Sequence, residues 1–430
     1  MAERSITINA KSFGGRAILL GVAAVVLLFA WFSVRWQLGN MLGNLTPANQ
    51  QDAREIADTA VGFAPYDPLA NWLEANTRQD YYSPEGVERT VRLFEEVVRL
   101  SPYDFRWWIE LGRAYEQAER PDRAEAAFRR SVDLAPEYTF PRWQFGNFLL
   151  RQNRADEAFA ELRKTTERSI AYREQVFSLA WDYFDKDPKK VEELAADQPD
   201  VRATLALFFA QRGQAEDSLR VWNRLTDEEK APHGEIARII AQRLHDLRFY
   251  RSALDFARQT GIDPDATFEA VTNGGFESFV GQSEDTLFGW RINRSDGKAD
   301  FSLDSSVKTE GSRSVKVNFK GYVKPDLYNV VQIVAVQPGQ RYRLTYKMRT
   351  ENLKSAGAPR LNITAGPENT IIAATAPYAT GTADWKEVAL EFVVPENADG
   401  VAIWTGRASC FEECPITGTL WYDDFKLSKL

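Results

Sequence analysis

The feature that most constrains this chain is an apolar run near its N-terminus, from Ala17 to Val34, which contains 18 residues and no charged side chain. Wound as an α-helix, the run spans about 27 Å, close to the hydrocarbon thickness of a lipid bilayer. No other stretch of the sequence is as apolar. The run therefore predicts one membrane-spanning helix over residues 17–36.

The charges that flank this run predict its orientation. Three basic residues and one acidic residue precede it, whereas Arg35 and then an acidic stretch follow it. Basic flanks tend to stay in the cytoplasm, so we expect a short cytoplasmic tail over residues 1–16 and the bulk of the chain across the membrane. A cleaved signal peptide is the alternative. An uncleaved anchor is favoured because a signal core is roughly 7–15 residues long and ends in small residues, whereas FSVRWQL (32–38) is bulky.

The scarcity of His and Cys disfavours several kinds of site. The chain has two His (His233 and His245) and two Cys (Cys410 and Cys414), too few for a zinc site of the usual Cys/His type, a haem or an iron–sulfur cluster. Both histidines fall in a helical region, where packing or solvent exposure is a simpler role than catalysis. With 53 basic and 61 acidic residues the net charge is −8, which disfavours a nucleic-acid partner.

Residues 45–265 carry a helical pattern that repeats. Large and small residues recur at the spacing of a helical hairpin: Trp108, Leu111, Gly112, Tyr115, Ala124, Phe128 and Pro136. The pattern returns 34 residues later, at Phe145, Gly146, Leu149, Ala158 and Leu162. It resembles the tetratricopeptide repeat (TPR). The resemblance implies roughly five to six hairpins that stack into a superhelix with a groove for a protein partner, and the order of helices in 168–233 stays open.

After Pro264 the pattern changes to strands. Glycines become frequent, and short runs of β-branched and aromatic residues alternate with turn residues. In RYRLTYKMRT (341–350), alternate positions place Tyr342, Leu344, Tyr346 and Met348 on one face and mostly basic residues on the other. Residues 267–430 are therefore predicted to form a sandwich of two antiparallel sheets. The expected fold class is multidomain: one transmembrane helix, an all-α TPR-like superhelix and an all-β sandwich.

The strand region resembles a known family. VTNGGFES (271–278), VQPGQRYRLTYKMRT (336–350) and GTLWYDDFKL (418–427) follow one another as in the galactose-binding-like jelly rolls of carbohydrate-binding module families 4 and 9. The resemblance implies that exposed aromatic rings stack on sugars. The candidate residues are Tyr322, Tyr328, Tyr378, Trp404 and Phe411. Packing in the core is the alternative role for each ring.

The same resemblance implies a structural calcium ion near the first and last strands. Glu277, Asp423 and Asp424 occupy the matching places, and carboxylate oxygens suit a hard cation. The alternative is that the two aspartates end a solvated strand and that Glu277 pairs with a base. Cys410 and Cys414 lie in one loop of a domain that we expect outside the cytoplasm, where disulfides persist, so a disulfide between them is predicted.

These features predict a membrane-anchored scaffold of the bacterial inner membrane with its bulk in the periplasm. Its repeats would bind a protein partner and its sandwich a glycan. The arrangement is similar to that of accessory proteins of bacterial surface polysaccharide assembly or export. A carbohydrate-active enzyme is one alternative, but no motif marks the pair of carboxylates that such an enzyme needs, so we expect no catalysis. A purely structural assembly protein that binds no sugar is the other alternative.

Overall fold

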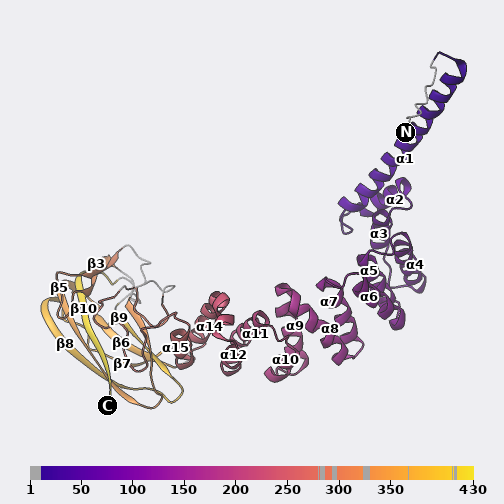
Figure 1. Cartoon of the computed structure of the whole chain (residues 1–430). Helices are drawn as coiled ribbons and strands as arrows, with labels where there is room; N and C mark the ends of the chain where they lie inside the picture. Colours follow the sequence, from indigo (N-terminus) through magenta and orange to yellow (C-terminus); the bar gives the residue numbers. More distant parts are fainter. Residues whose placement is uncertain are drawn as a thin grey trace, which may run out of the picture. The chain divides into compact units, whose positions relative to one another are not determined.

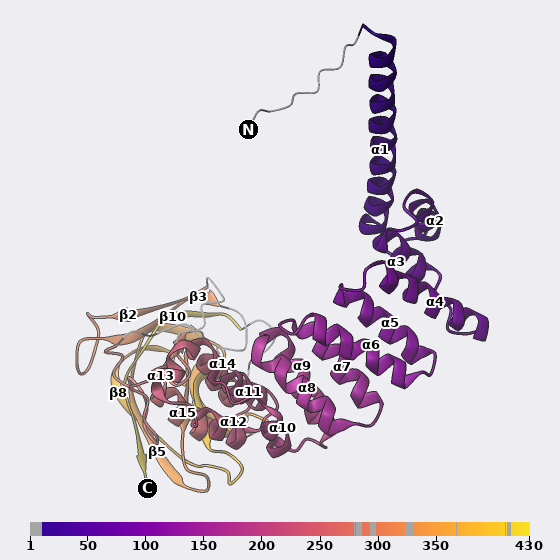
Figure 2. The same ribbon diagram turned by 45° about the vertical axis from the view of Figure 1, so that its right-hand side comes forward.

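The computed structural model describes residues 11–278, 280, 286–292, 298–322, 330–366, 368–408, 410 and 414–430. Figures 1 and 2 show the chain in two views. It divides into two compact units, Met1–Ala196 and Asp197–Leu430. Helices precede strands along the sequence, so the expected fold class is confirmed.

The first unit begins with the long helix α1 (Phe13–Leu45). Among the described residues, α1 is the one helix long and apolar enough to cross a membrane, and its most apolar 18-residue window is not buried against any other part of the chain. Ser12 caps the helix by accepting a hydrogen bond from the Gly15 backbone at 3.0 Å. The predicted span, 17–36, therefore lies inside one continuous helix that extends well beyond it.

The other helices of the first unit are short and form successive hairpins (Figure 2). They are α2 (Ala53–Phe63), α3 (Pro68–Thr77), α4 (Pro84–Leu100), α5 (Phe105–Gln117), α6 (Pro121–Leu134), α7 (Thr139–Arg151), α8 (Ala155–Arg168), α9 (Ile170–Tyr183) and α10 (Pro188–Leu194). Gly112 lets α5 approach α6, because a Cβ there would lie 3.0 Å from the Phe128 ring. Gly146 plays the same part between α7 and α8 against Leu162. The small residues of the repeat pattern thus stand where helices meet.

The second unit starts with helices and ends with the sandwich. Its helices are α11 (Pro199–Gln211), α12 (Ala215–Trp222), α13 (Asp227–Lys230), a short 3₁₀ turn (Ala231–His233), α14 (Gly234–Asp246) and α15 (Tyr250–Gln259). This gives the order of the helices that the sequence left open. The change from helices to strands falls after α15, whereas the division between the compact units falls before α11.

The sandwich consists of two five-stranded sheets in which every pair of neighbouring strands is antiparallel. One sheet has the order β1-β4-β9-β6-β7 and the other β2-β3-β10-β5-β8. The strands are β1 (Arg291–Ile292), β2 (Ala299–Asp304), β3 (Ser314–Tyr322), β4 (Val330–Ala335), β5 (Arg341–Ser355), β6 (Pro359–Ala365), β7 (Thr370–Ala374), β8 (Gly381–Val393), β9 (Gly400–Arg407) and β10 (Ile416–Lys429). The alternation predicted for 341–350 is confirmed, because Tyr342, Leu344, Tyr346 and Met348 are all buried in the core.

The last helical hairpin is joined to the sandwich by specific contacts. Asp263 accepts hydrogen bonds from the backbones of Leu287 at 2.7 Å and Phe288 at 3.0 Å. His245 is buried and packs edge-on against Tyr250 and Phe288, with ring centroids 5.3 and 5.4 Å away. The helix-packing role expected for His245 is therefore confirmed. These contacts explain why α14 and α15 belong to the same compact unit as the strands.

Candidate functional site

One face of the sandwich combines a half-buried tryptophan with buried polar side chains. It is the face of the β1-β4-β9-β6-β7 sheet that points away from the core. Along β9, Val401 and Ile403 enter the core, so strand alternation places Trp404 on the opposite face. Its register partners there are Val331 of β4 and Asn362 of β6. We call this surface the Trp404 face; it comprises Val331, Arg360, Asn362, Thr364, Ala402, Trp404 and Gly406.

Gly406 allows the Trp404 side chain to lie against the sheet. A Cβ at position 406 would come within 2.9 Å of the Trp404 ring and closer still to the Asn362 amide. Packed atoms do not approach so closely, so any other residue would displace both groups. The glycine therefore lets an indole and a primary amide lie side by side on this face.

Polar side chains are buried beside Trp404. Asn362 and Thr364 are almost fully buried, at 1% and 2% exposure. Within the described part of the chain, Asn362 Oδ1, Thr364 Oγ1 and Arg360 Nε have no hydrogen-bond partner. Buried polar atoms in folded proteins nearly always have a partner, which is either protein, water or ligand. These three atoms are therefore candidates to bond a water molecule or a ligand.

The Trp404 face suits a ligand with an apolar side and a polar rim. An indole offers a flat apolar surface, and neighbouring amide, hydroxyl and guanidinium groups fix the orientation of a ligand through hydrogen bonds. A sugar ring has this character, because its C–H groups form one flat side and its hydroxyls surround it. Such a face is suited to recognising a ligand of this kind.

Two of the five predicted sugar-stacking aromatics are not at the surface. Tyr378 is 7% exposed, and its hydroxyl lies 2.7 Å from that of Tyr346 and 3.3 Å from that of Tyr422. Burial raises the pKa of Tyr378 well above its ordinary value. Tyr322, at the end of β3, is 4% exposed within the core. The prediction of exposed rings is therefore wrong for Tyr322 and Tyr378, because both face the space between the sheets.

Of the other three, Trp404 lies on the face described above, whereas Tyr328 and Phe411 fall outside the described residues. Sequence reasoning missed Arg360, Asn362 and Thr364. The signal was present in RLNIT (360–364), where polar residues alternate with apolar residues that enter the core. That alternation is the mark of a strand whose outer face is polar.

The three carboxylates proposed for calcium are engaged by the protein itself. Glu277 accepts hydrogen bonds from the Ser312 backbone at 2.8 Å and from the Ser312 hydroxyl, which together lower its pKa. Asp423 accepts from the backbone and the hydroxyl of Thr309, both at 2.8 Å. These bonds tie the segment before β3 to the rest of the sandwich.

Asp424 lies beside two cations. Lys426 Nζ is 2.6 Å and Lys347 Nζ 3.3 Å from its oxygens. The described residues contain no group of three or more side chains of His, Cys, Asp or Glu placed to hold a metal ion. This donor set does not fit a calcium site, because its oxygens already have donors and two ammonium groups would repel the ion. Calcium binding stays a prediction from the family resemblance.

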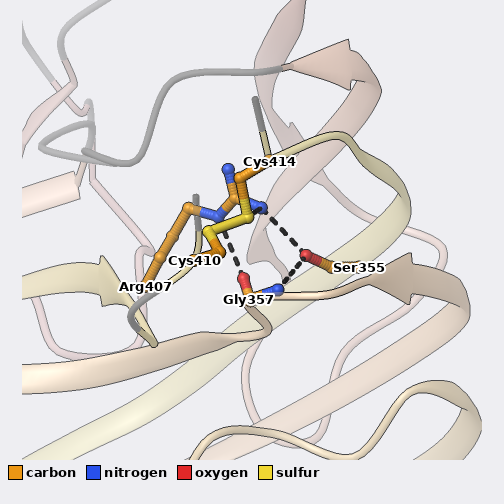
Figure 3. The surroundings of a disulfide bond; sticks show 5 residues. All are labelled: Ser355, Gly357, Arg407, Cys410 and Cys414. Carbon is orange, nitrogen blue, oxygen red and sulfur yellow. Dashed lines mark hydrogen bonds between the residues drawn. A yellow bond between two sulfur atoms is a disulfide. The ribbon is translucent and has the colours of Figure 1, made fainter. Parts of the chain in front are cut away.

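The predicted disulfide is present in the structure. Figure 3 shows Cys410 bonded to Cys414, with their Cα atoms 5.9 Å apart. Arg407, at the end of β9, donates from Nε to the Gly357 carbonyl at 3.0 Å and from Nη2 to the Ser355 hydroxyl at 2.9 Å (Figure 3). Burial lowers the pKa of Arg407. Arg407 thus joins the end of β9 to the turn between β5 and β6, and its Nη2 also donates to Cys414 Sγ at 2.9 Å.

A groove in the first unit is the candidate surface for a protein partner. It is an open groove of about 660 Å³ lined by residues of α4, α5 and α6. Its apolar part includes Trp108 and Leu111, and its polar part has three arginines, Arg99, Arg123 and Arg130, and one acid, Glu95. Trp108 is half-buried and donates from Nε1 to the Pro102 carbonyl at 2.9 Å, so its ring is held in place. An apolar floor with arginines beside it suits an acidic, partly apolar segment.

The described residues thus contain two unlike candidate surfaces, one in the sandwich and one in the helical region. Residues 269–405 match the family model of a carbohydrate binding domain. A stretch of 88 residues is 26% identical to tetratricopeptide repeat protein 37 of Xenopus laevis, and it covers 20% of this chain and only 5% of that protein. The sandwich is therefore similar to a carbohydrate binding domain, and the helical region before it is TPR-like.

Solved structures also resemble each part. One, described as CBM4 structure and function, is 17% identical, has a TM-score of 0.28, and covers 37% of this chain and 99% of its own. MamA from Desulfovibrio magneticus RS-1 is 24% identical, has a TM-score of 0.26, and covers 32% of this chain and 74% of its own.

Proposed function

We propose that this protein is a membrane-anchored scaffold of the bacterial inner membrane that brings a glycan and a protein partner together outside the cytoplasm, in the assembly or export of a surface polysaccharide. The observation that carries this proposal is the Trp404 face, where an indole lies beside buried polar atoms that have no partner among the described residues. The protein binds the glycan without chemically changing it.

The anchor rests on α1. Its apolar window is not buried against the protein, and an apolar surface of this length is stable in a bilayer but not in water. The basic residues that precede the run support a cytoplasmic N-terminus, which places the repeats and the sandwich on the other side. The disulfide supports the same placement, because disulfides persist in oxidising compartments.

The glycan is tested with the intact protein in detergent on a glycan array. The variant Trp404→Ala removes the indole, and Trp385→Ala is the matched control because Trp385 lies on β8 of the other sheet. We expect Trp404→Ala to weaken glycan binding at least about tenfold, equivalent to 1.4 kcal/mol, and Trp385→Ala to leave it unchanged. Absence of binding to every glycan tested would instead favour the purely structural alternative.

The same preparation separates binding from catalysis. A bound, end-labelled polysaccharide is incubated with the protein, and its chain length is followed by gel electrophoresis. We expect no change in length. Shortening that is lost in Trp404→Ala would instead favour the alternative of a carbohydrate-active enzyme.

The protein partner is tested through the groove of α4 to α6. The double variant Arg123→Glu and Arg130→Glu reverses the charge beside the groove, whereas Arg92→Glu makes the same change on α4 at a residue that does not line it. Membranes expressing each tagged variant are cross-linked and the attached proteins are identified. We expect a partner that is captured by the wild type and by Arg92→Glu but lost in the double variant. Equal capture by all three would rule out this groove.

A further inference from the structure

The helix α1 does not end where its apolar run ends. It continues to Leu45, and in this last part Gly39 and Gly43 pack against α2 and α3. A Cβ on Gly39 would lie 2.7 Å from the Ala60 carbonyl, and one on Gly43 would lie 2.7 Å from the Ala70 backbone nitrogen. Only glycine permits these approaches. The α2–α3 hairpin therefore packs directly against the C-terminal part of α1.

Two hydrogen bonds fix the height of this hairpin along α1. Arg35 donates to the Gly62 carbonyl at 2.8 Å, and Asn40 donates to the Asp67 carboxylate at 2.9 Å. Gly62 lies in the last turn of α2 and Asp67 is the N-cap of α3, so both acceptors flank the α2–α3 turn. At the opposite end of the hairpin, Arg54 donates to the Thr77 carbonyl at 3.2 Å. The α2–α3 turn is thus the end of the hairpin that lies nearest the apolar run.

The depth of the turn follows from helix geometry. Gly39 is five positions after Val34, the last residue of the apolar run, which amounts to about 7.5 Å along the helix axis. When the run of about 27 Å is centred in a hydrocarbon core of about 30 Å, Gly39 lies about 6 Å outside the hydrocarbon. The headgroup layer on each side of the hydrocarbon is roughly 5–7 Å thick. When α1 spans a bilayer, the turn therefore lies at the level of the lipid headgroups.

Exposed aromatic side chains gather at this level. Tyr66 is 75% exposed, Trp36 50% and Phe63 36%. Large aromatic rings are costly to expose to water but favourable at a membrane interface.

We propose that Trp36, Phe63 and Tyr66 form an interfacial surface that rests in the headgroup layer of the leaflet through which α1 leaves the membrane. This inference rests on the anchoring in the proposed function. This surface would restrict the orientation of the first unit relative to the membrane. The helix α1 alone leaves rotation and tilt free, whereas a second lipid contact through the α2–α3 turn restricts both. The first hairpin of the array is then held against the membrane.

The test places a fluorescent probe at single cysteines. Cys410 and Cys414 are bonded to each other, so a thiol reagent labels an introduced cysteine selectively. The variants are Tyr66→Cys and Phe63→Cys. The matched control is Tyr82→Cys, which is fully exposed in the α3–α4 turn, beyond the opposite end of α3. Each full-length variant is labelled with the environment-sensitive probe NBD and reconstituted into phosphatidylcholine vesicles that contain phosphatidylglycerol.

We expect the probe at positions 63 and 66 to show blue-shifted emission and to be reduced several-fold more slowly by dithionite than the probe at position 82. Lipids brominated near the headgroup should quench it at 63 and 66 and not at 82. Vesicle flotation of each sample reports anchoring separately. A chain that floats while all three probes behave as in water overturns this inference and leaves the anchor intact, whereas a chain that fails to float overturns both.

Discussion

The carboxylate of Asp399 accepts a hydrogen bond from the backbone N–H of Arg251 at 2.9 Å, although the two residues are 148 positions apart. Asp399 lies just before β9, and Arg251 lies in the first turn of α15. The carboxylate therefore serves as an N-terminal cap supplied from another part of the fold. The next residue, Gly400, has no side chain and leaves room for the Tyr250 ring.

This contact predicts that Asp399 stabilises the second unit. In Asp399→Ala the first turn of α15 loses its acceptor, and we expect the free energy of unfolding to fall by about 1–2 kcal/mol, as for other N-caps. For a unit of this size that corresponds to a midpoint lower by roughly 2–4 °C per kcal/mol. Thermal unfolding followed by circular dichroism measures it.

The control for this prediction is Asp265→Ala, because Asp265 is an exposed aspartate in the same unit. It should unfold at the wild-type temperature. Equal midpoints for the wild type and Asp399→Ala would show that the cap contributes nothing to the docking of α15 on the sandwich.

The same contact shows what sequence patterns can predict. Apolar runs, helical spacing and strand alternation are local, so α1, the hairpins around Trp108 and the inward face of β5 are all visible in the sequence. The bond between Asp399 and Arg251 joins segments that no local pattern relates. The docking of α14 and α15 on the sandwich therefore became visible only in the structure.

The ion pairs of Asp424 predict a pH dependence of stability. Burial alone would raise the pKa of Asp424, but Lys426 and Lys347 outweigh it and hold that pKa below its ordinary value of about 3.9. Because the pKa is lower in the folded state, this contribution to stability is complete above the unfolded pKa and is lost as the pH falls through the folded value. We expect stability to decrease below about pH 4.

The variant Asp424→Asn tests this prediction. Asp424 has a φ of 54°, a left-handed conformation that asparagine also tolerates, so the substitution removes the charge and leaves the backbone unstrained. Unfolding midpoints in denaturant between pH 3 and pH 7 should vary less in this variant than in the wild type. Asp384→Asn is the control, because Asp384 pairs with Arg349 but is 85% exposed and should contribute little. Identical pH profiles for Asp424→Asn and the wild type would contradict the prediction.

The Trp404 face predicts that one substitution separates binding from stability. Thr364 Oγ1 is buried and has no partner in the described part of the chain, so Thr364→Val removes an unsatisfied hydroxyl and keeps the shape. We expect the free energy of unfolding to stay the same or to rise by about 1 kcal/mol, while glycan affinity falls. Denaturant unfolding and glycan titration of the same sample measure the two effects.

The control for this prediction is Thr405→Val, which we expect to change stability and not glycan binding. Thr405, on the core side of β9, donates to the Tyr422 hydroxyl at 3.2 Å. The same substitution there should cost about 1 kcal/mol and leave glycan affinity unchanged. If Thr364→Val instead destabilised the protein as much as Thr405→Val, its hydroxyl would have a structural partner and not a ligand.

The candidate site shows the limit of reasoning by residue type. Rings stack on sugars, which makes every aromatic residue of the sandwich a candidate, but its position in the alternation of the strand decides whether the ring faces the core or the surface. Tyr322 and Trp404 are both strand aromatics, yet one enters the core and the other lies on the outer face. Which face a strand residue occupies can be inferred only when the core-facing residues of the same strand are known. For β9 these are Val401 and Ile403.

The disulfide predicts a modest, local effect of reduction. Cys410 and Cys414 are separated by four positions, so the bond closes a short loop, and the loss of chain entropy predicts a stabilisation of about 2 kcal/mol. Dithiothreitol should therefore lower the unfolding midpoint of the wild type without abolishing the fold. The double variant Cys410→Ser and Cys414→Ser should start at that lower midpoint and show no response to reductant.

Thiol counting with Ellman's reagent in denaturant should find no free thiol in the wild type before reduction. Two free thiols in protein purified without reductant from its membrane would show that the pair is not oxidised in the cell, which would also remove one support for a location outside the cytoplasm.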